Sequence, residues 1–292
     1  MMNYDKTRYK RWRKGKDKIA FMLVCFFSLA AMFPLFFILW DVVSKGYKNF
    51  NLSLFTEVTP SSMDAMLARM NGEPIPGGIL NGITGTILIV GMAILFSVFL
   101  GLFVGIYLAD NKGKRLAGVV SYLTDLLQGM PSIVIGIIAY AWIVKPLGGY
   151  SALAGSVALT IMMLPMIVRS TEETLKMLPA AYKEAGLALG SSYTAVVFRI
   201  LIPSGFGGIF TGILLAVSRV MGETAPLMLT ALGASVVNWK VMEPTSAVPL
   251  LIWDFYNDPN LVDLIWSSSL LLLIVIFLLN WIAKIVARKW KI

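Results

Sequence analysis

The sequence contains no histidine and a single cysteine, and few of its residues are charged. Without histidine the chain lacks the commonest metal ligand and the usual proton shuttle near neutral pH. Cys25 cannot form a disulfide within the chain, and we expect its thiol to be buried as a small apolar group. Charged residues make up 14% of the chain, whereas soluble domains contain about 25%. These absences exclude a histidine-based metal site and an internal disulfide framework.

Apolar residues are abundant instead, at 58% of the chain with a mean hydropathy of +0.78. They form continuous rather than alternating runs, which excludes a membrane β-barrel. A helix of about 20 apolar residues crosses a hydrocarbon core of about 30 Å and satisfies its own backbone polar groups. We therefore predict an all-α, multi-pass transmembrane helical bundle with six spans, at residues 19–43, 79–109, 116–144, 150–168, 204–232 and 264–283.

The remaining segments complete the predicted organisation. Residues 1–18 form a basic tail, followed by a first transmembrane helix that is retained as a signal anchor rather than cleaved. Residues 44–78 form an external loop, and residues 79–287 a core with five spans. This core includes a cytoplasmic connection at 170–203 and an external loop at 233–263, in which we expect a short amphipathic helix at 248–255. Residues 288–292 form a second cytoplasmic tail.

The distribution of lysine and arginine predicts the orientation. Nineteen of the 25 lie in the two tails and in the second and fourth connections, whereas five lie on the opposite side. The positive-inside rule then places both termini in the cytoplasm, in agreement with an even number of spans. The net charge of +9 reflects this topology and contact with anionic lipid, and no nucleic-acid partner is expected, because no sizeable basic domain lies outside the membrane.

The connection at 170–203 contains signals for two short helices. Pro179 suits the first turn of one helix, which can end at Gly190, and a second helix is expected at 193–202 before Pro203. Composition alone favours an ordinary loop between spans. The residues Glu184, Ala185, Gly186 and Gly190, with Ile-Leu-Ile-Pro at 200–203, nevertheless resemble the EAA loop of ABC importer permeases. The spacing matches, while Gly186 replaces the usual alanine and Ile202 the usual leucine.

That resemblance implies that Glu184, Ala185, Gly186 and Gly190 belong to a coupling helix that docks on an ATPase subunit. No phosphate-binding G-x-x-x-x-G-K-[ST] sequence occurs in the chain. We therefore expect this chain to bind no cofactor, with ATP and Mg²⁺ held by partner ATPase subunits.

Two charges lie inside the fifth predicted span. Arg219 and Glu223 are four residues apart and are expected on one helix face. Because a charge at the bilayer centre costs about 2.5–3.5 kcal/mol on insertion scales, such residues face protein or water. One interpretation is a buried ion pair that fixes helix packing. The other is a transport path, in which the planar guanidinium binds a tetrahedral oxyanion and the carboxylate accepts the proton of hydrogen phosphate.

Three segments resemble the PstA-type permeases of phosphate-specific ABC importers. They are Arg-Val-Met-Gly-Glu-Thr-Ala-Pro-Leu at 219–227, Val-Arg-Ser-Thr-Glu-Glu at 168–173 and Gln-Gly-Met-Pro-Ser-Ile-Val-Ile-Gly at 128–136. The resemblance covers nearly the whole chain and is weakest before residue 79. It implies a type I ABC importer permease fold, and it implies a substrate path that includes Arg219, Glu223, Thr224, Arg169 and Glu172. Arg169 has an equally good interpretation as a positive-inside anchor.

Asp125 and Gln128 lie about one turn apart in the third predicted span. They can line a cavity or bond to a neighbouring helix, and the second alternative is slightly favoured. Gly101 and Gly105 form a G-x-x-x-G pair that predicts close helix packing rather than a site.

The expected function is that of a permease subunit without covalent chemistry of its own, which imports inorganic phosphate across a bacterial cytoplasmic membrane. Expected partners are a PstC-like second permease, a dimer of ATPase subunits, an external phosphate-binding protein and membrane lipid. A permease for molybdate or sulfate is the nearest alternative. A stand-alone channel or ion-driven transporter has no use for a coupling helix, and a structural scaffold leaves Arg219 unexplained.

Overall fold

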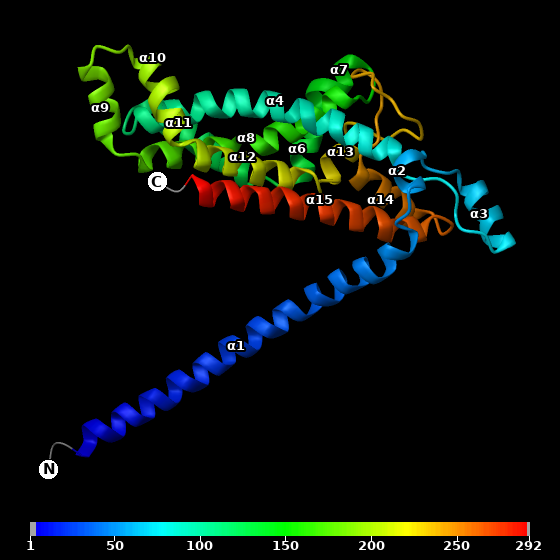
Figure 1. The fold of residues 1–292 in the computed structure, drawn as a ribbon, viewed down its shortest axis with the longest axis horizontal. Coiled ribbons are helices and arrows are strands. Elements are labelled where there is room, and N and C mark those ends of the chain that lie inside the picture. Colours follow the sequence, from blue (N-terminus) through cyan, green and yellow to red (C-terminus); the bar gives the residue numbers. More distant parts are fainter. Residues whose placement is uncertain (1–3, 291–292) are drawn as a thin grey trace.

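The computed structural model of the protein describes residues 4–290, so residues 1–3 of the predicted basic tail and residues 291–292 of the C-terminal tail lie outside it. The described chain is almost entirely helical (Figure 1). Its elements are α1 (Tyr4–Gly46), η1 (Tyr47–Asn49), α2 (Ser53–Thr56), α3 (Ser62–Asn71), α4 (Leu80–Asp110), α5 (Arg115–Gly129), α6 (Ser132–Ala139), η2 (Tyr140–Val144), α7 (Lys145–Leu147), α8 (Ala152–Met177), α9 (Ala180–Ala188), α10 (Tyr193–Val196), η3 (Val197–Leu201), α11 (Ile202–Ser204), α12 (Phe206–Val220), α13 (Ala225–Met228), α14 (Val248–Asn257) and α15 (Val262–Lys289).

The number of helices that can cross a bilayer is four, or up to six, among the described residues. The helices α1, α4, α8 and α15 are each long and apolar enough. Two further pairs qualify only if each counts as one broken span: Arg115–Gly129 with Ser132–Leu147, bent by 108°, and Tyr193–Ser204 with Phe206–Val220, bent by 72°. The multi-pass helical prediction is therefore confirmed. The predicted spans at 116–144 and 204–232 are each broken into shorter helices, because α5 ends at Gly129 and α12 at Val220.

Proline explains the break after α5 and the end of α12. Pro131 has no N–H and restricts the residue before it, so α5 ends at Gly129 and a new helix begins after Pro131. Pro226 lies in the first turn of α13, where its missing N–H costs nothing. In a continuous helix its ring would clash with the carbonyl of residue 222, and α12 instead ends at Val220.

Several predicted boundaries differ from those observed. Helix α1 begins at Tyr4 and runs through the basic segment without a break. Helix α8 continues to Met177, so the first residues of the predicted cytoplasmic connection are helical. The external loop at 44–78 contains η1, α2 and α3, and the helix expected at 248–255 is confirmed as α14.

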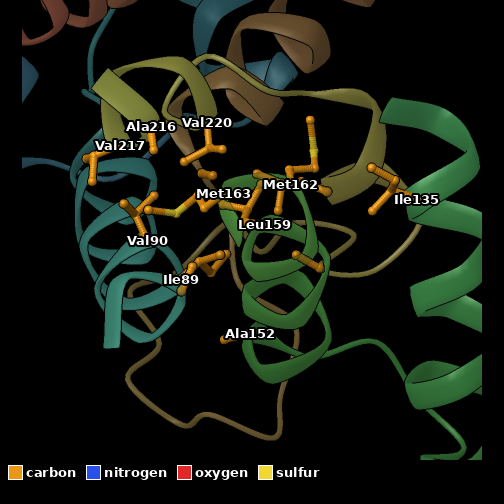
Figure 2. Packing of buried hydrophobic residues seen from close by; sticks show 14 of the residues in the cluster. Ile89, Val90, Ile135, Ala152, Leu159, Met162, Met163, Ala216, Val217 and Val220 are labelled. Carbon is orange, nitrogen blue, oxygen red and sulfur yellow. The ribbon is translucent and has the colours of Figure 1, made fainter. Parts of the chain in front are cut away.

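The apolar core lies between α4, α8 and α12. Figure 2 shows Ile89 and Val90 of α4 facing Leu159 and Met163 of α8, with Val220 of α12 beside them. Further along, α4 and α8 approach closely at two glycines. A Cβ atom on Gly101 would lie 2.7 Å from Ile167 Cγ2, and one on Gly105 would lie 2.6 Å from Thr171 Cβ. The predicted role of the G-x-x-x-G pair in close packing is therefore confirmed.

Residues of the 233–263 segment cap the N-terminal start of α8. The backbone N–H groups of Ala152 and Leu153 donate to the carbonyls of Glu243 and Val241, at 3.1 and 2.9 Å. These bonds satisfy donors that the first turn of a helix leaves unpaired. Lys240 lies 2.7 Å from Glu243 and lowers the pKa of that carboxyl, which keeps the pair ionised near neutral pH.

Helix α1 diverges from the rest of the molecule (Figure 1). It approaches α15 only near its C-terminal end, where Gly46 packs closely against Trp266 and Leu270. The apolar side chains between Ile19 and Trp40 are mostly exposed. Cys25 is exposed among them, so the expectation of a buried thiol is wrong, because α1 has no neighbouring helix at that level.

We predict that Gly105→Leu destabilises the α4–α8 contact by about 1–3 kcal/mol, because the new side chain collides with Thr171 and the carbonyl of Val168. The matched control is Gly91→Leu on the same helix, where no atom lies within 4 Å of an added Cβ. Thermal unfolding of the purified variants in detergent measures the difference. Equal melting temperatures for both variants would contradict this account of the packing.

Candidate functional site

A cavity of about 740 Å³ opens between α5, α8, α12 and α15. It lies toward the C-terminal ends of α8 and α15, as its lining by Met177 and Trp290 shows. Its wall combines charged, hydroxyl and glycine residues, which leaves room and polar partners for a hydrated solute. The lining residues are Asp125, Gln128, Met166, Arg169, Ser170, Glu173, Thr174, Met177, Gly207, Gly208, Thr211, Gly212, Leu215, Ala287 and Trp290.

Arg169 is the most extensively bonded side chain of this cavity. Its Nε and Nη2 donate to Asp125 Oδ1 at 3.0 and 2.5 Å, and Nη1 donates to Glu172 Oε2 at 2.6 Å. Nη2 also donates to the carbonyl and hydroxyl oxygens of Ser121 at 3.0 and 2.8 Å. The guanidinium thus links α5 to α8 through charge-assisted hydrogen bonds, which are the strong class of such bonds.

Glu172 anchors this network from the buried side. Its side chain is 7% exposed and accepts from both Arg169 and Lys176, the latter at 2.5 Å. The spacing of three and four residues along α8 brings the three side chains onto one face of the helix. A buried carboxylate with two cationic partners is compensated, whereas an unpaired one would be costly.

Arg219 lies close to this cavity but is not one of the residues that line it. It is exposed near the end of α12, one turn beyond the cavity-lining Leu215. Its Nη1 lies 3.7 Å from the sulfur of Met166, which also lines the cavity and precedes Arg169 by three residues on α8. Met166 therefore links the two arginines, because it contacts Arg219 and lines the cavity together with Arg169; the side chain of Arg219 is exposed.

The expectation that Arg219 and Glu223 share a helix face is wrong. Helix α12 ends at Val220, and Glu223 and Thr224 follow in a non-helical turn before α13. No ion pair joins Arg219 to Glu223, both of which lie within the described residues. Both Glu223 and Thr224 are partly exposed. The structure thus joins Arg169 to Glu172, and leaves Arg219, Glu223 and Thr224 as a second group without an internal ion pair.

Asp125 combines both alternatives that its position in the sequence allowed. It lines the cavity, and it bonds to a neighbouring helix through Arg169. Gln128 lines the same cavity. Sequence reasoning missed Ser121 and Lys176 as members of the network, although the spacing from Glu172 to Lys176 is the usual one for helix ion pairs.

The segment with the EAA-like sequence forms a helical projection, visible as α9 and α10 at one end of Figure 1. The predicted helix after Pro179 is confirmed as α9, and Gly190 follows its end with φ of +79°, a conformation that glycine adopts without strain. Glu184 and Ala185 are exposed. Gly186 is buried, and a Cβ there would lie 2.8 Å from Val196 Cγ2, which gives a physical reason for glycine at this position.

The projection is fastened to α4 by a contact that the sequence did not indicate. Lys183 Nζ lies 2.6 Å from Asp110 Oδ1 at the end of α4. The hydroxyl of Tyr193 donates to the other oxygen of Asp110, and Lys183 also lies over the ring of Tyr193. Asp110 is 73 residues from Lys183, so no local pattern could reveal the pair.

Comparison with known proteins agrees with this arrangement. Residues 101–292 match the family described as binding-protein-dependent transport system inner membrane component. The chain is also 34% identical over 290 residues to the phosphate transport system permease protein PstA of Yersinia pestis, covering 98% of this chain and 95% of that protein. The chain belongs to this permease family. It is similarly 33% identical over 271 residues to the probable PstA protein of Methanocaldococcus jannaschii, with 92% of each covered.

Solved structures of this permease family's fold include the MetNI methionine ABC transporter in inward-facing conformations. One such chain aligns with a TM-score of 0.60 and 20% sequence identity, covering 72% of this chain and 95% of that one. A second crystal form aligns with a TM-score of 0.59 and 18% identity, covering 80% and 100%. The predicted type I ABC importer permease fold is therefore confirmed.

We predict that Glu172→Gln lowers the free energy of unfolding by about 1.5–3 kcal/mol, because the variant removes the charge that compensates Arg169 and Lys176. Glu173→Gln is the matched control, since its side chain is the exposed neighbour on the same helix. Denaturation in detergent micelles measures both. If Glu173→Gln destabilised as much as Glu172→Gln, the buried pairing would not be the cause.

Proposed function

We propose that this chain is the permease subunit of an ATP-driven importer that moves inorganic phosphate across the cytoplasmic membrane. The observation that carries the proposal is a pair of arginines, Arg169 in the wall of the cavity and Arg219 in contact with the cavity-lining Met166, in a chain similar over nearly its whole length to PstA proteins. A guanidinium offers paired N–H donors that match the oxygens of a tetrahedral oxyanion.

The partners follow from the family and from the exposed surfaces. As a permease of an ABC importer, the chain works with ATPase subunits, which hydrolyse ATP, and with a substrate-binding protein. The exposed face of α9, with Glu184 and Ala185, supports docking of an ATPase. The side chain of Arg219 is exposed, which supports a second, PstC-like permease as the other half of the path. The exposed apolar surface of α1 suits that partner or lipid.

The orientation is part of the same proposal. In Figure 1 the start of α1, the end of α15 and the projection formed by α9 and α10 all lie toward one end of the molecule. Placing that end in the cytoplasm puts both termini there and follows the positive-inside rule. The external phosphate-binding protein would then meet the opposite end, where α2, α3 and α14 lie.

The transport step needs two conformations of the paired permeases. ATP binding to the partner subunits, which hold ATP and Mg²⁺, shifts the population between an outward-open and an inward-open state through α9. Arg219 receives the oxyanion from the outer side, and Arg169 lies in the wall of the cavity. Glu223 and Thr224 are positioned after α12 to accept or donate a hydrogen bond to a protonated phosphate.

The experiment that tests the substrate uses the complete complex in liposomes. Phosphate with its binding protein is expected to stimulate ATP hydrolysis and uptake, whereas sulfate and molybdate with theirs are not. If sulfate or molybdate stimulated ATP hydrolysis and uptake instead, the substrate would be that oxyanion and not phosphate. Uptake by the isolated chain without ATP would favour a channel or a secondary transporter.

We predict that Arg219→Gln reduces phosphate uptake by at least about 100-fold, because the variant removes the charge-assisted donors that face the path. Arg219 forms no ion pair within the described residues, so the complex should still assemble. Gel filtration of the complex and labelled phosphate uptake measure the two effects. Normal uptake by Arg219→Gln would remove this residue from the path.

We predict that Glu184→Arg abolishes stimulated ATP hydrolysis and releases the ATPase subunits, because it reverses the charge on the exposed face of α9. Glu184→Gln, which keeps the shape, should retain part of the coupling. Both variants should insert and melt like the parent chain, since the side chain is exposed. Co-purification and ATPase assays measure the outcome, and a Glu184→Arg complex with full ATP-driven uptake would refute docking at this residue.

A further inference from the structure

The two carboxylates that hold Arg169 differ in how firmly they are themselves held. Glu172 is 7% exposed and lies on α8 with Arg169, and it has Lys176 as a second partner. Asp125 is 60% exposed and comes from a different helix. Within the described residues Arg169 is its only hydrogen-bond and ion-pair partner. Asp125 is therefore the carboxylate that can dissociate from Arg169, whereas Glu172 remains bound to it.

A single oxygen of Asp125, Oδ1, accepts both of its hydrogen bonds from Arg169, and Ser121 shares the Nη2 donor. Both bonds of Asp125 go to the edge formed by Nε and Nη2, while Glu172 takes Nη1. Asp125 and Arg169 both line the cavity of about 740 Å³, together with the hydroxyl residues Ser170, Thr174 and Thr211. The Nε–Nη2 edge is the one that a carboxylate or a phosphate binds with two parallel hydrogen bonds.

The chain allows α5 to move separately from the next helix. Helix α5 ends at Gly129, and the bend between this segment and the helices from Ser132 to Leu147 is 108°. Asp125 lies about one turn before that break. A small shift of α5 away from α8 would therefore withdraw the carboxylate without displacing α6 or the apolar core around Ile135.

We propose that Asp125 is an internal stand-in for the transported oxyanion. Its carboxylate occupies the Nε–Nη2 edge of Arg169 when the cavity is empty, and phosphate must displace it to bind there. When Asp125 returns, it competes with phosphate for the same donors and so promotes release into the cytoplasm. This inference rests on the proposed function, and it makes Asp125 a residue that sets the affinity of the inner site.

The competition also explains how Arg169 can remain charged when no oxyanion is bound in the cavity. Arg169, Lys176, Asp125 and Glu172 together carry two positive and two negative charges in this group of ion pairs. A bound oxyanion would take the place of Asp125 beside Arg169, once α5 has carried that carboxylate away from α8. If Asp125 only held α5 against α8, the opposite result would follow. Removing its charge would then disorder Arg169 and weaken anion binding.

The experiment measures binding of labelled inorganic phosphate to the complete complex in nanodiscs, without ATP and without the binding protein. Asp125→Asn is expected to bind phosphate about fivefold to tenfold more tightly than the parent complex, because a charged competitor is removed. Arg169→Gln and the double variant should both show no gain. Glu173→Gln is the matched control, since it removes a negative charge from the same cavity and should change affinity less than about twofold.

Three outcomes would overturn the proposal. They are unchanged or weaker binding by Asp125→Asn, an equal gain in Glu173→Gln, and a gain that persists in the double variant without Arg169. If Asp125→Asn does not assemble, Asp125→Ser removes the same charge and gives the same test. ATP-driven uptake by the parent complex is measured in parallel. If the parent complex takes up phosphate normally but the Asp125 variants bind it no more tightly, only the role of Asp125 is refuted. If the parent complex takes up no phosphate, the proposed function is refuted, and the binding assay still decides the role of Asp125.

Discussion

The close contact between α4 and α8 determines where the charged side chains of this protein can lie. Gly101 and Gly105 allow α4 to meet Ile167 and Thr171 of α8 with almost no intervening space. Arg169 lies two residues from both, about 200° around the helix from the face toward α4. It is therefore directed away from α4 and reaches Asp125 and Ser121 on α5. A helix packed less closely would leave the direction of Arg169 undefined.

Charge compensation differs between the two arginines, and the difference suits the proposed path. Arg169 is surrounded by two carboxylates and the oxygens of Ser121, so its charge is fully countered within the chain. Among the described residues 4–290, Arg219 has only the sulfur of Met166 within hydrogen-bonding range, and its side chain is exposed. Because an uncompensated charge at membrane depth needs water, a ligand or a partner protein, Arg219 is the arginine to which the proposed function assigns the first contact with the anion.

The projection around α9 is mechanically connected to this region. Lys183 and Tyr193 bind Asp110 at the end of α4, and α4 packs along α8, which carries Arg169 and Glu172. The contacts form a continuous series from the proposed ATPase-docking surface to the inner cavity. Gly186 contributes by letting α9 lie close to Val196, which packs the short helices of the projection against each other.

The sequence by itself determined the class of the protein and much of its local structure. Long apolar runs specify membrane helices wherever they occur, and Pro179 and Gly190 mark the bounds of α9 through their own backbone preferences. The resemblance in residues 168–173 and 219–227 located the arginines. Only the tertiary structure showed that α12 ends before Glu223, that Asp125 binds Arg169 and that Asp110 holds Lys183. Apolar periodicity and turn propensities act over a few neighbouring residues, whereas ion pairs between helices depend on how segments 44 or 73 residues apart pack against each other.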